Sequence, residues 1–215
     1  MILRKKIAIL ILVAFYFFGW LGTRSELMQF YLREFTSFNH FMELTPLTLG
    51  MSAFLLFSFH ESWTLSNIVF FVACVVITFF IESIGVHTGV IFGPYRYGDV
   101  LGWKIWQTPV IIGVNWLILV YCTCHVAVRL VQNSTWHPFV AALFMVALDF
   151  FIEPVAIRFN MWEWEGGTVP LQNYLAWYCI AWIACWFALK SNVTRVQNSM
   201  AYYVLGLQFM FFLFV

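Results

Sequence analysis

The stretch Glu82-Ser-Ile-Gly-Val-His-Thr-Gly-Val-Ile-Phe-Gly-Pro-Tyr-Arg-Tyr-Gly98 begins inside an apolar run and ends in a turn-rich segment. The apolar run covers residues 65–86, and about 20 such residues are enough to cross a bilayer as a helix. A carboxylate, a histidine, an arginine and two tyrosines fall within the stretch, although only 10% of the chain is charged. An ionisable group at membrane depth costs about 3 kcal/mol or more. The stretch therefore predicts a membrane-spanning helix with a functional site at its end.

The overall composition is that of a membrane protein. The chain has 215 residues, of which 63% are hydrophobic and 21% aromatic, and its mean hydropathy is +0.85. A soluble domain would carry about 25% charged residues. We therefore expect a single integral-membrane domain over residues 1–215, in contact with membrane lipid. The net charge is only +1 and no basic stripe is present, which excludes nucleic acid as a partner.

Seven apolar segments follow one another along the chain, and none shows the alternation typical of a strand. They cover residues 5–22, 43–60, 65–86, 107–130, 137–158, 170–190 and 199–215. In lipid, a helix satisfies all of its backbone hydrogen bonds within one segment. The sequence therefore predicts an all-α fold, a polytopic transmembrane helical bundle of about seven transmembrane helices.

The charges in the loops predict how the bundle is oriented. Loops on the N-terminal side carry six cations, Arg4, Lys5, Lys6, Arg129, Lys190 and Arg195. Loops on the other side carry five, Arg24, Arg33, Arg96, Lys104 and Arg158. Cytoplasmic loops are richer in Lys and Arg, so the margin of one favours a cytoplasmic N-terminus.

Three carboxyl groups are predicted to lie at one end of the bundle. The third and fifth segments run in the same direction through the membrane, because successive crossings alternate. Glu82 is near the end of the third segment, and Asp149 and Glu153 are in the second half of the fifth. All three side chains should therefore lie in the same leaflet half.

The pair Asp149 and Glu153 suits acid catalysis. Their spacing of i and i+4 places both on one helix face, and two anions in apolar surroundings cannot both ionise cheaply. A carboxylic acid that stays neutral near pH 7 is what a general acid requires. The alternative is a pair of structural acids, hydrogen-bonded to tyrosine, asparagine or Arg158.

Glu82 and His87 are further candidates for catalysis. Glu82 follows the same reasoning as the pair, and its structural alternative is a salt bridge to Arg96 or Arg158. His87 suits a proton shuttle, but it would serve equally as a hydrogen-bonded loop residue. The histidines and carboxylates show no HxxxH, ExxH or DxxD spacing, so we expect no metal.

Aromatic and amide side chains beside these acids are candidates for contact with a substrate. They are Tyr95, Arg96, Tyr97, Asn115, Trp162, Trp164, Asn173 and Trp177. Ring faces can stabilise a cation, and amides at membrane depth can bind water or join helices. The alternative for the two tryptophans at 162 and 164 is an aromatic belt at the membrane surface.

Two blocks of this sequence resemble the carotenoid biosynthesis membrane protein family, whose characterised members are carotenoid 1′,2′-hydratases of the CruF type. The first block is Glu82-x-x-Gly85-x-x-x-Gly89-x-x-Phe92-Gly93-x-Tyr95-x-Tyr97. The second is Asp149-x-x-x-Glu153-Pro-Val-Ala156, then Trp162-x-Trp164, then Val169-Pro-Leu-x-Asn173-Tyr-x-x-Trp177. The similarity extends from about the second to the seventh segment.

This resemblance implies a hydro-lyase that adds water across the terminal C1′=C2′ double bond of an acyclic carotenoid end. It implies a carotenoid substrate of the lycopene or γ-carotene type, no cofactor, and a bacterial cytoplasmic (inner) membrane. Two alternatives stay open: a carotenoid end-group cyclase, which would use the same protonation, and a non-enzymatic carotenoid-binding or carrier protein.

Overall fold

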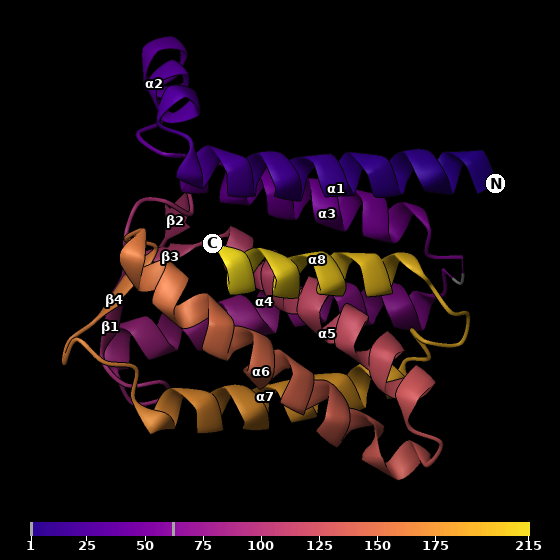
Figure 1. The fold of residues 1–215 in the computed structure, drawn as a ribbon. Coiled ribbons are helices and arrows are strands. Elements are labelled where there is room, and N and C mark those ends of the chain that lie inside the picture. The colour runs from indigo at the N-terminus through magenta and orange to yellow at the C-terminus, as the bar shows by residue number, and fades with distance from the viewer. Residues whose placement is uncertain (1, 62) are drawn as a thin grey trace.

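The chain folds into a bundle of α-helices that run side by side, from which the short helix Glu26–Phe35 projects (Figure 1), as the computed structural model shows for residues 2–61 and 63–215. The α-helices are α1 (Ile2–Arg24), α2 (Glu26–Phe35), α3 (Thr45–Ser58), α4 (Leu65–Thr88), α5 (Ile111–Leu130), α6 (His137–Arg158), α7 (Leu171–Lys190) and α8 (Met200–Phe214). Two short 3-10 helices, η1 (Phe41–Leu44) and η2 (Ser134–Trp136), precede α3 and α6. The predicted all-α class is confirmed.

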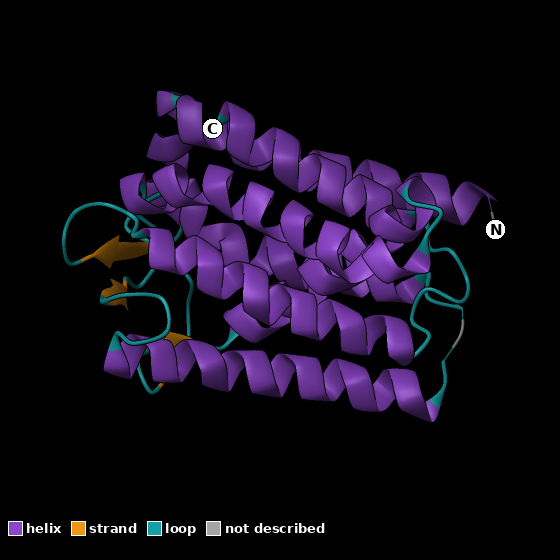
Figure 2. Cartoon of the chain, turned by 90° about the horizontal axis from the view of Figure 1, so that it is seen from below, coloured by secondary structure: helices purple, strands orange, loops and turns teal. Residues whose placement is uncertain are grey.

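Five helical segments are long and apolar enough to cross a membrane within the described part of the chain. They are Leu3–Arg24, Phe41–Ser58, Leu65–Thr88, Ile111–Leu130 and Ser134–Arg158. The other two predicted segments form α7 and α8, which lie alongside the other helices in Figure 1. The view from below shows the same arrangement of helices running side by side (Figure 2). Helix α8 is shorter, and polar residues early in α7 lower its hydropathy. The protein is therefore a polytopic membrane protein.

Helix α5 forms the centre of the bundle. It packs against α3, α4, α6, α7 and α8, and nearly every side chain from Trp116 to Ala127 is buried. Gly113 brings α5 close to α4, because a Cβ at this glycine would lie 2.5 Å from the carbonyl oxygen of Val75. The helix thus holds α4 and α6 at fixed distances on either side of it.

The helix ends on which the candidate site depends follow ordinary capping rules. Helix α4 begins after Thr64, whose hydroxyl accepts a hydrogen bond from the backbone N–H of Asn67. It ends at Gly89, which adopts a φ of 63° and so reverses the chain. Helix α6 continues through Pro154 to Arg158, although proline removes one backbone donor. The backbone next to Glu153 therefore stays helical.

Two small antiparallel sheets were not expected from the sequence. Strand β1 (Tyr95–Tyr97) pairs with β4 (Trp162–Trp164), and β2 (Lys104–Ile105) pairs with β3 (Thr108–Pro109). Both sheets lie at the end of the bundle away from the N-terminus (Figure 1). The β1–β4 pair joins the loop after α4 to the loop after α6, so the two sequence blocks meet.

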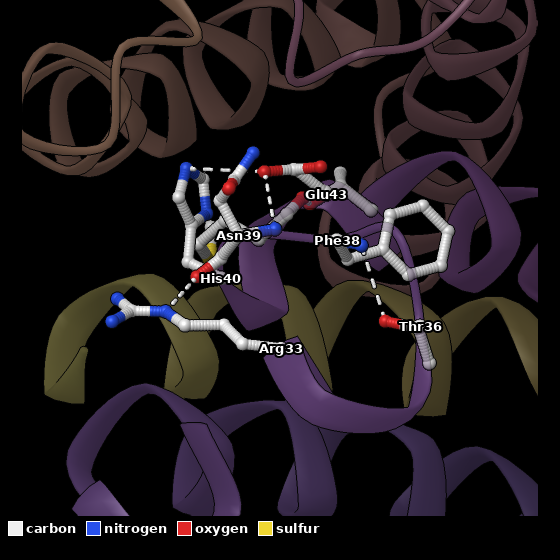
Figure 3. A network of polar contacts seen from close by, with 8 residues as sticks. Arg33, Thr36, Phe38, Asn39, His40 and Glu43 are labelled. Atoms are coloured by element: carbon white, nitrogen blue, oxygen red, sulfur yellow. Dashed lines mark hydrogen bonds and ion pairs between the residues drawn. The ribbon is translucent and has the colours of Figure 1, made fainter. Parts of the chain in front are cut away.

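The link between α2 and η1 is held by its own polar contacts (Figure 3). Arg33 donates a hydrogen bond from Nε to the carbonyl oxygen of Asn39, at 2.8 Å. The backbone N–H of Asn39 donates to Glu43 Oε1 at 3.0 Å, and His40 Nε2 lies 3.8 Å from the same oxygen. His40 and Glu43 are therefore engaged within this link, from which the chain enters α3.

Candidate active site

The three predicted carboxyl groups line one cavity at the end of the bundle that carries the small sheets. Glu82, Asp149 and Glu153 are each no more than 3% exposed, and all three contribute to the wall of this cavity. Its volume is about 70 Å³, which is room for a few water molecules, since one needs roughly 10–15 Å³ of such space. The three acids thus lie at the same end of the bundle, as the order of the predicted helices indicates.

Glu82 receives hydrogen bonds from three side chains. Its Oε2 accepts from the hydroxyls of Tyr95, at 2.7 Å, and Tyr97, at 3.0 Å. Its Oε1 accepts from Trp116 Nε1 at 2.8 Å. Donors from β1 and from α5 thus fix both carboxyl oxygens of a residue on α4.

The β1–β4 ladder explains how the aromatic side chains reach the cavity. Tyr95 pairs with Trp164 and Tyr97 with Trp162, while Arg96 pairs with Glu163 between them. Successive residues of a strand point to opposite faces. The four aromatic residues therefore face the cavity, and the Arg96–Glu163 ion pair faces outwards, where both side chains are more than half exposed.

Glu153 is surrounded by donors in the same way as Glu82. Its Oε2 accepts hydrogen bonds from the indole N–H groups of Trp162 and Trp164, both at 2.9 Å. Its Oε1 accepts from Asn173 Nδ2 at 3.2 Å. Two tryptophans of β4 and an amide of α7 therefore hold this carboxyl group.

Asp149 has fewer donors than the other two acids. It accepts one hydrogen bond among the described residues, from Asn173 Nδ2 to Oδ2 at 3.0 Å. The same amide nitrogen also donates to Glu153, so Asn173 bridges the two carboxyl groups with its two N–H bonds. Donors favour the charged form of a carboxyl group, so of this pair Asp149 is the better suited to keep a proton.

Tyr95 and Tyr97 have perturbed titration. Burial raises the pKa of both phenols well above the ordinary value, and the charge of Glu82 raises each pKa further. Both hydroxyls are therefore permanent donors at physiological pH. They keep Glu82 supplied with hydrogen bonds over the whole range in which the protein would work.

Aromatic rings and one amide complete the cavity wall. Trp116 and Trp177 are stacked, with ring centroids 4.2 Å apart and an angle of 26° between the planes. Both rings and the side chain of Asn115 line the cavity. A charge that formed in this space would therefore meet ring faces as well as carboxyl oxygens.

Residues 42–215 match the model of a family described as carotenoid biosynthesis protein. The chain belongs to this family. No curated protein and no solved structure matches the chain.

The family match contains every residue described above for the cavity. It begins within η1, so α1 and α2 lie outside it. The resemblance read from the two sequence blocks is thus confirmed at the level of the family. The family description gives a place in carotenoid metabolism, and it specifies neither a reaction nor a substrate.

Two of the candidate site residues lie outside the cavity in this family member. His87 contacts the carbonyl oxygen of Ser83 through Nδ1, at 2.8 Å, one turn earlier in α4. Arg96 is on the outer face of β1, paired with Glu163. Neither side chain is among the residues that line the cavity. The expectation that His87 and Arg96 lie beside the three acids is therefore corrected.

The ion pairs considered for Glu82 are also absent within the described part of the chain. Arg96 forms an ion pair with Glu163, and Arg158 donates a hydrogen bond to the carbonyl oxygen of Val215. Hydrogen bonds from neutral groups surround Glu82 instead. No group of three or more histidine, cysteine or acidic side chains among the described residues could hold a metal ion.

Sequence reasoning missed Gln208 as part of the site. This residue of α8 is 2% exposed and lines the cavity. It is an isolated amide in an apolar helix, the same signal that singled out Asn115 and Asn173. The hydrogen bond from Trp116 to Glu82 has no signal in the sequence either, because it depends on which faces of α4 and α5 meet.

Proposed function

We propose that this protein is a hydro-lyase that adds water to the terminal C1′=C2′ double bond of an acyclic carotenoid end group. The observation that carries the proposal is the cavity in which three buried carboxyl groups and stacked aromatic rings surround room for water. The family supports a carotenoid as the substrate. Lycopene and γ-carotene both have the required end group.

Asp149 is the proposed general acid. Its carboxyl group gives a proton to C2′ of the alkene, the electron pair of the double bond forms the new C–H bond, and a tertiary cation remains at C1′. The carboxyl group that best holds a proton before reaction is the one with fewest donors, and Asp149 has one where Glu153 has three.

The stacked rings of Trp116 and Trp177 are proposed to stabilise this cation. A ring face attracts a positive charge within about 6 Å of its centroid, and the attraction is stronger where water is excluded. The anionic carboxylates of the cavity act in the same sense. The cation can therefore survive until water reaches C1′.

Glu82 is proposed to place the water and to remove its proton. The water oxygen bonds to C1′, and the proton that it loses passes to a carboxylate of the cavity, from which Asp149 is restored. The sum is one alkene plus one water giving one tertiary alcohol, with no change of oxidation state. Tyr95, Tyr97 and Trp116 hold Glu82 in position for this task.

The location of the cavity suits a long polyene. A forty-carbon chain is about as long as the roughly 30 Å hydrocarbon core of a bilayer. Its end group would reach the level of the three acids while the remaining chain lies among apolar helices. Water reaches this level more easily than the middle of the membrane.

We further propose a bacterial cytoplasmic membrane, from the family resemblance, with the N-terminus inside, from the six-to-five distribution of loop cations. Strands β1 and β4, which contribute to the cavity wall, lie at the end of the bundle opposite the N-terminus (Figure 1), so the cavity would lie in the outer-leaflet half. Reporter fusions at the two ends of the chain would test this orientation.

The test of function is expression in a host that makes lycopene or γ-carotene. A pigment heavier by one water and more polar supports the proposal. An unchanged pigment, with the protein present in the membrane, contradicts it. A converted pigment of unchanged mass would indicate the cyclase, and unconverted pigment that copurifies with the protein would indicate a carrier.

A further inference from the structure

A second cavity lies between α1, α3 and α8. Its volume is about 430 Å³, and its wall is almost entirely apolar, with Ala14 and Gly19 on α1 and Leu47 on α3. Phe18 and Leu47 at its edge are 54% and 56% exposed. The cavity is therefore a groove that opens on the outer surface of the bundle, where lipid would lie.

This groove reaches the carboxylate cavity. Thr45, Leu49, Gln208 and Phe212 line both spaces. The apolar groove and the carboxylate cavity therefore adjoin each other at these four residues. A molecule that entered the groove from the lipid side would meet the reacting groups at its inner end.

Gln208 marks the junction of the two spaces. It is 2% exposed. Its amide interacts with the buried hydroxyl of Tyr16, and its Oε1 accepts no hydrogen bond within the described chain. An unpaired buried amide oxygen is unfavourable. A bound molecule that donates a hydrogen bond to this oxygen would remove that cost. A water or a hydroxyl group at the edge of the cavity could do so.

The two spaces differ in the chemistry that they can accept. The groove suits a hydrocarbon, and the smaller cavity suits water beside carboxyl groups. Along α1, the groove extends from Ala14 to Gly19, which is about 8 Å at 1.5 Å per residue. It can therefore take the terminal part of a long chain and leave the remainder among the lipids.

We infer that this groove binds the end of a linear, unoxygenated isoprenoid chain, and that Gln208 binds the water or the product hydroxyl where the groove meets the acids. The inference rests on the proposed function for the identity of the reacting end. The groove as a binding site for the chain can be tested without it.

A second groove provides a matched control. It lies between α4 and α7, has a volume of about 510 Å³ and is also mainly apolar. Among its described lining residues none is shared with the carboxylate cavity. Ala73 lines this groove as Ala14 lines the first, so Ala→Phe adds the same volume in each.

The experiment compares Ala14→Phe and Ala73→Phe in lycopene-producing cells. Lycopene retained per mole of detergent-purified protein is the first measurement, and hydrated product is the second. We expect Ala14→Phe to lower retention about tenfold or more, which corresponds to about 1.4 kcal/mol. Ala73→Phe should stay near the wild-type value. If Ala14→Phe fails to fold, Leu47→Trp fills the same groove at its exposed opening.

Gln208→Leu separates the two roles. It keeps the size of the side chain and removes the amide, so we expect retained lycopene with little hydrated product. Wild-type retention in both Ala14→Phe and Leu47→Trp, or loss in Ala73→Phe instead, would overturn the inference. So would phospholipid that is lost from Ala14→Phe while lycopene stays bound.

Failure of the proposed function has a different signature. If lycopene is lost from Ala14→Phe but the wild type never forms a hydrated product, the groove stands as a polyene site and hydration is wrong. If hydrated product forms equally in the wild type and in both groove-blocking variants, hydration stands and this groove is wrong.

Discussion

Asp149 and Glu153 lie one helical turn apart, yet their surroundings differ. Asn173 donates to both carboxyl groups, whereas the indole groups of Trp162 and Trp164 donate to Glu153 alone. The difference comes from the loop that follows α6, which returns over Glu153. We propose Asp149 as the proton donor because β4, which follows α6, supplies hydrogen bonds to Glu153 alone.

The first prediction concerns the acid itself. Asp149→Asn keeps the shape of the side chain and removes its acidic proton, so hydration should fall by about 10²-fold or more. Product per unit of membrane-inserted protein is the measurement. Glu165→Gln is the control, because Glu165 is an exposed acid at the same end of the bundle. Full turnover in Asp149→Asn would exclude Asp149 as the acid.

The second prediction concerns alkaline pH. The pKa values of Tyr95 and Tyr97 are raised by burial and then by Glu82, so folding favours their neutral forms. This contribution to stability is fully present below the unfolded value of about 10, and it is lost as pH rises through the raised folded values. The protein should therefore lose stability steeply above about pH 10.

Thermal unfolding in detergent across this pH range is the measurement for the second prediction. In Tyr95→Phe/Tyr97→Phe the loss at alkaline pH should be shallower, because two of the titrating groups are gone. Tyr31→Phe is the control, since the ring of Tyr31 is 51% exposed. An identical pH profile in the double variant would contradict the assignment.

At the level of elements, β1 and β4 decide which side chains reach the cavity. Their sequences, Tyr-Arg-Tyr and Trp-Glu-Trp, alternate aromatic and charged residues. This is the period of two that a strand with one buried face requires. The signal was present in the sequence, but each run is only three residues long. The pattern identifies the cavity-facing side chains only together with the pairing of the two strands, which the sequence does not show.

The third prediction concerns the contact between α4 and α5. A Cβ at Gly113 would meet the backbone oxygen of Val75 at 2.5 Å, and a backbone atom cannot move aside as a side chain can. Gly113→Ala should therefore destabilise the fold by about 1–3 kcal/mol. It should also weaken activity, because the shift separates Trp116 from Glu82.

The control for Gly113→Ala is Gly206→Ala in α8, where no atom lies within 4 Å of the added carbon. That substitution should be neutral or stabilise the helix by up to about 1 kcal/mol. Chemical denaturation in mixed micelles is the measurement. Equal effects of the two substitutions would mean that the α4–α5 contact does not limit stability.

At the scale of the whole molecule, large apolar side chains are exposed on most of the helices. Large hydrophobic side chains of α1, α3, α4, α6, α7 and α8 face outwards, while α5 is covered on all sides. A patch of a few hundred Å² is already unusual on a soluble monomer. The fold therefore requires lipid around this surface as well as a packed core.

The fourth prediction follows from this surface. The protein should stay in the membrane after washing with high salt or alkaline carbonate, and detergent should release it, because several helices cross the hydrocarbon. Immunodetection of the membrane and soluble fractions is the measurement. A peripheral membrane protein from the same cells is the control, and release by carbonate would contradict the polytopic assignment.

The sequence by itself determined the helices, the family and the end of the bundle where the acids gather. In lipid, backbone groups must bond within one segment, so the apolar runs become helices and successive runs alternate in direction. Tertiary structure decided which donors surround each acid, placed His87 and Arg96 outside the cavity, and brought Gln208 of α8 to its wall. These outcomes depend on how the loops return over the helix ends and on which helices become neighbours. Both are set by packing between segments far apart in the chain, which the pattern within a single segment does not specify.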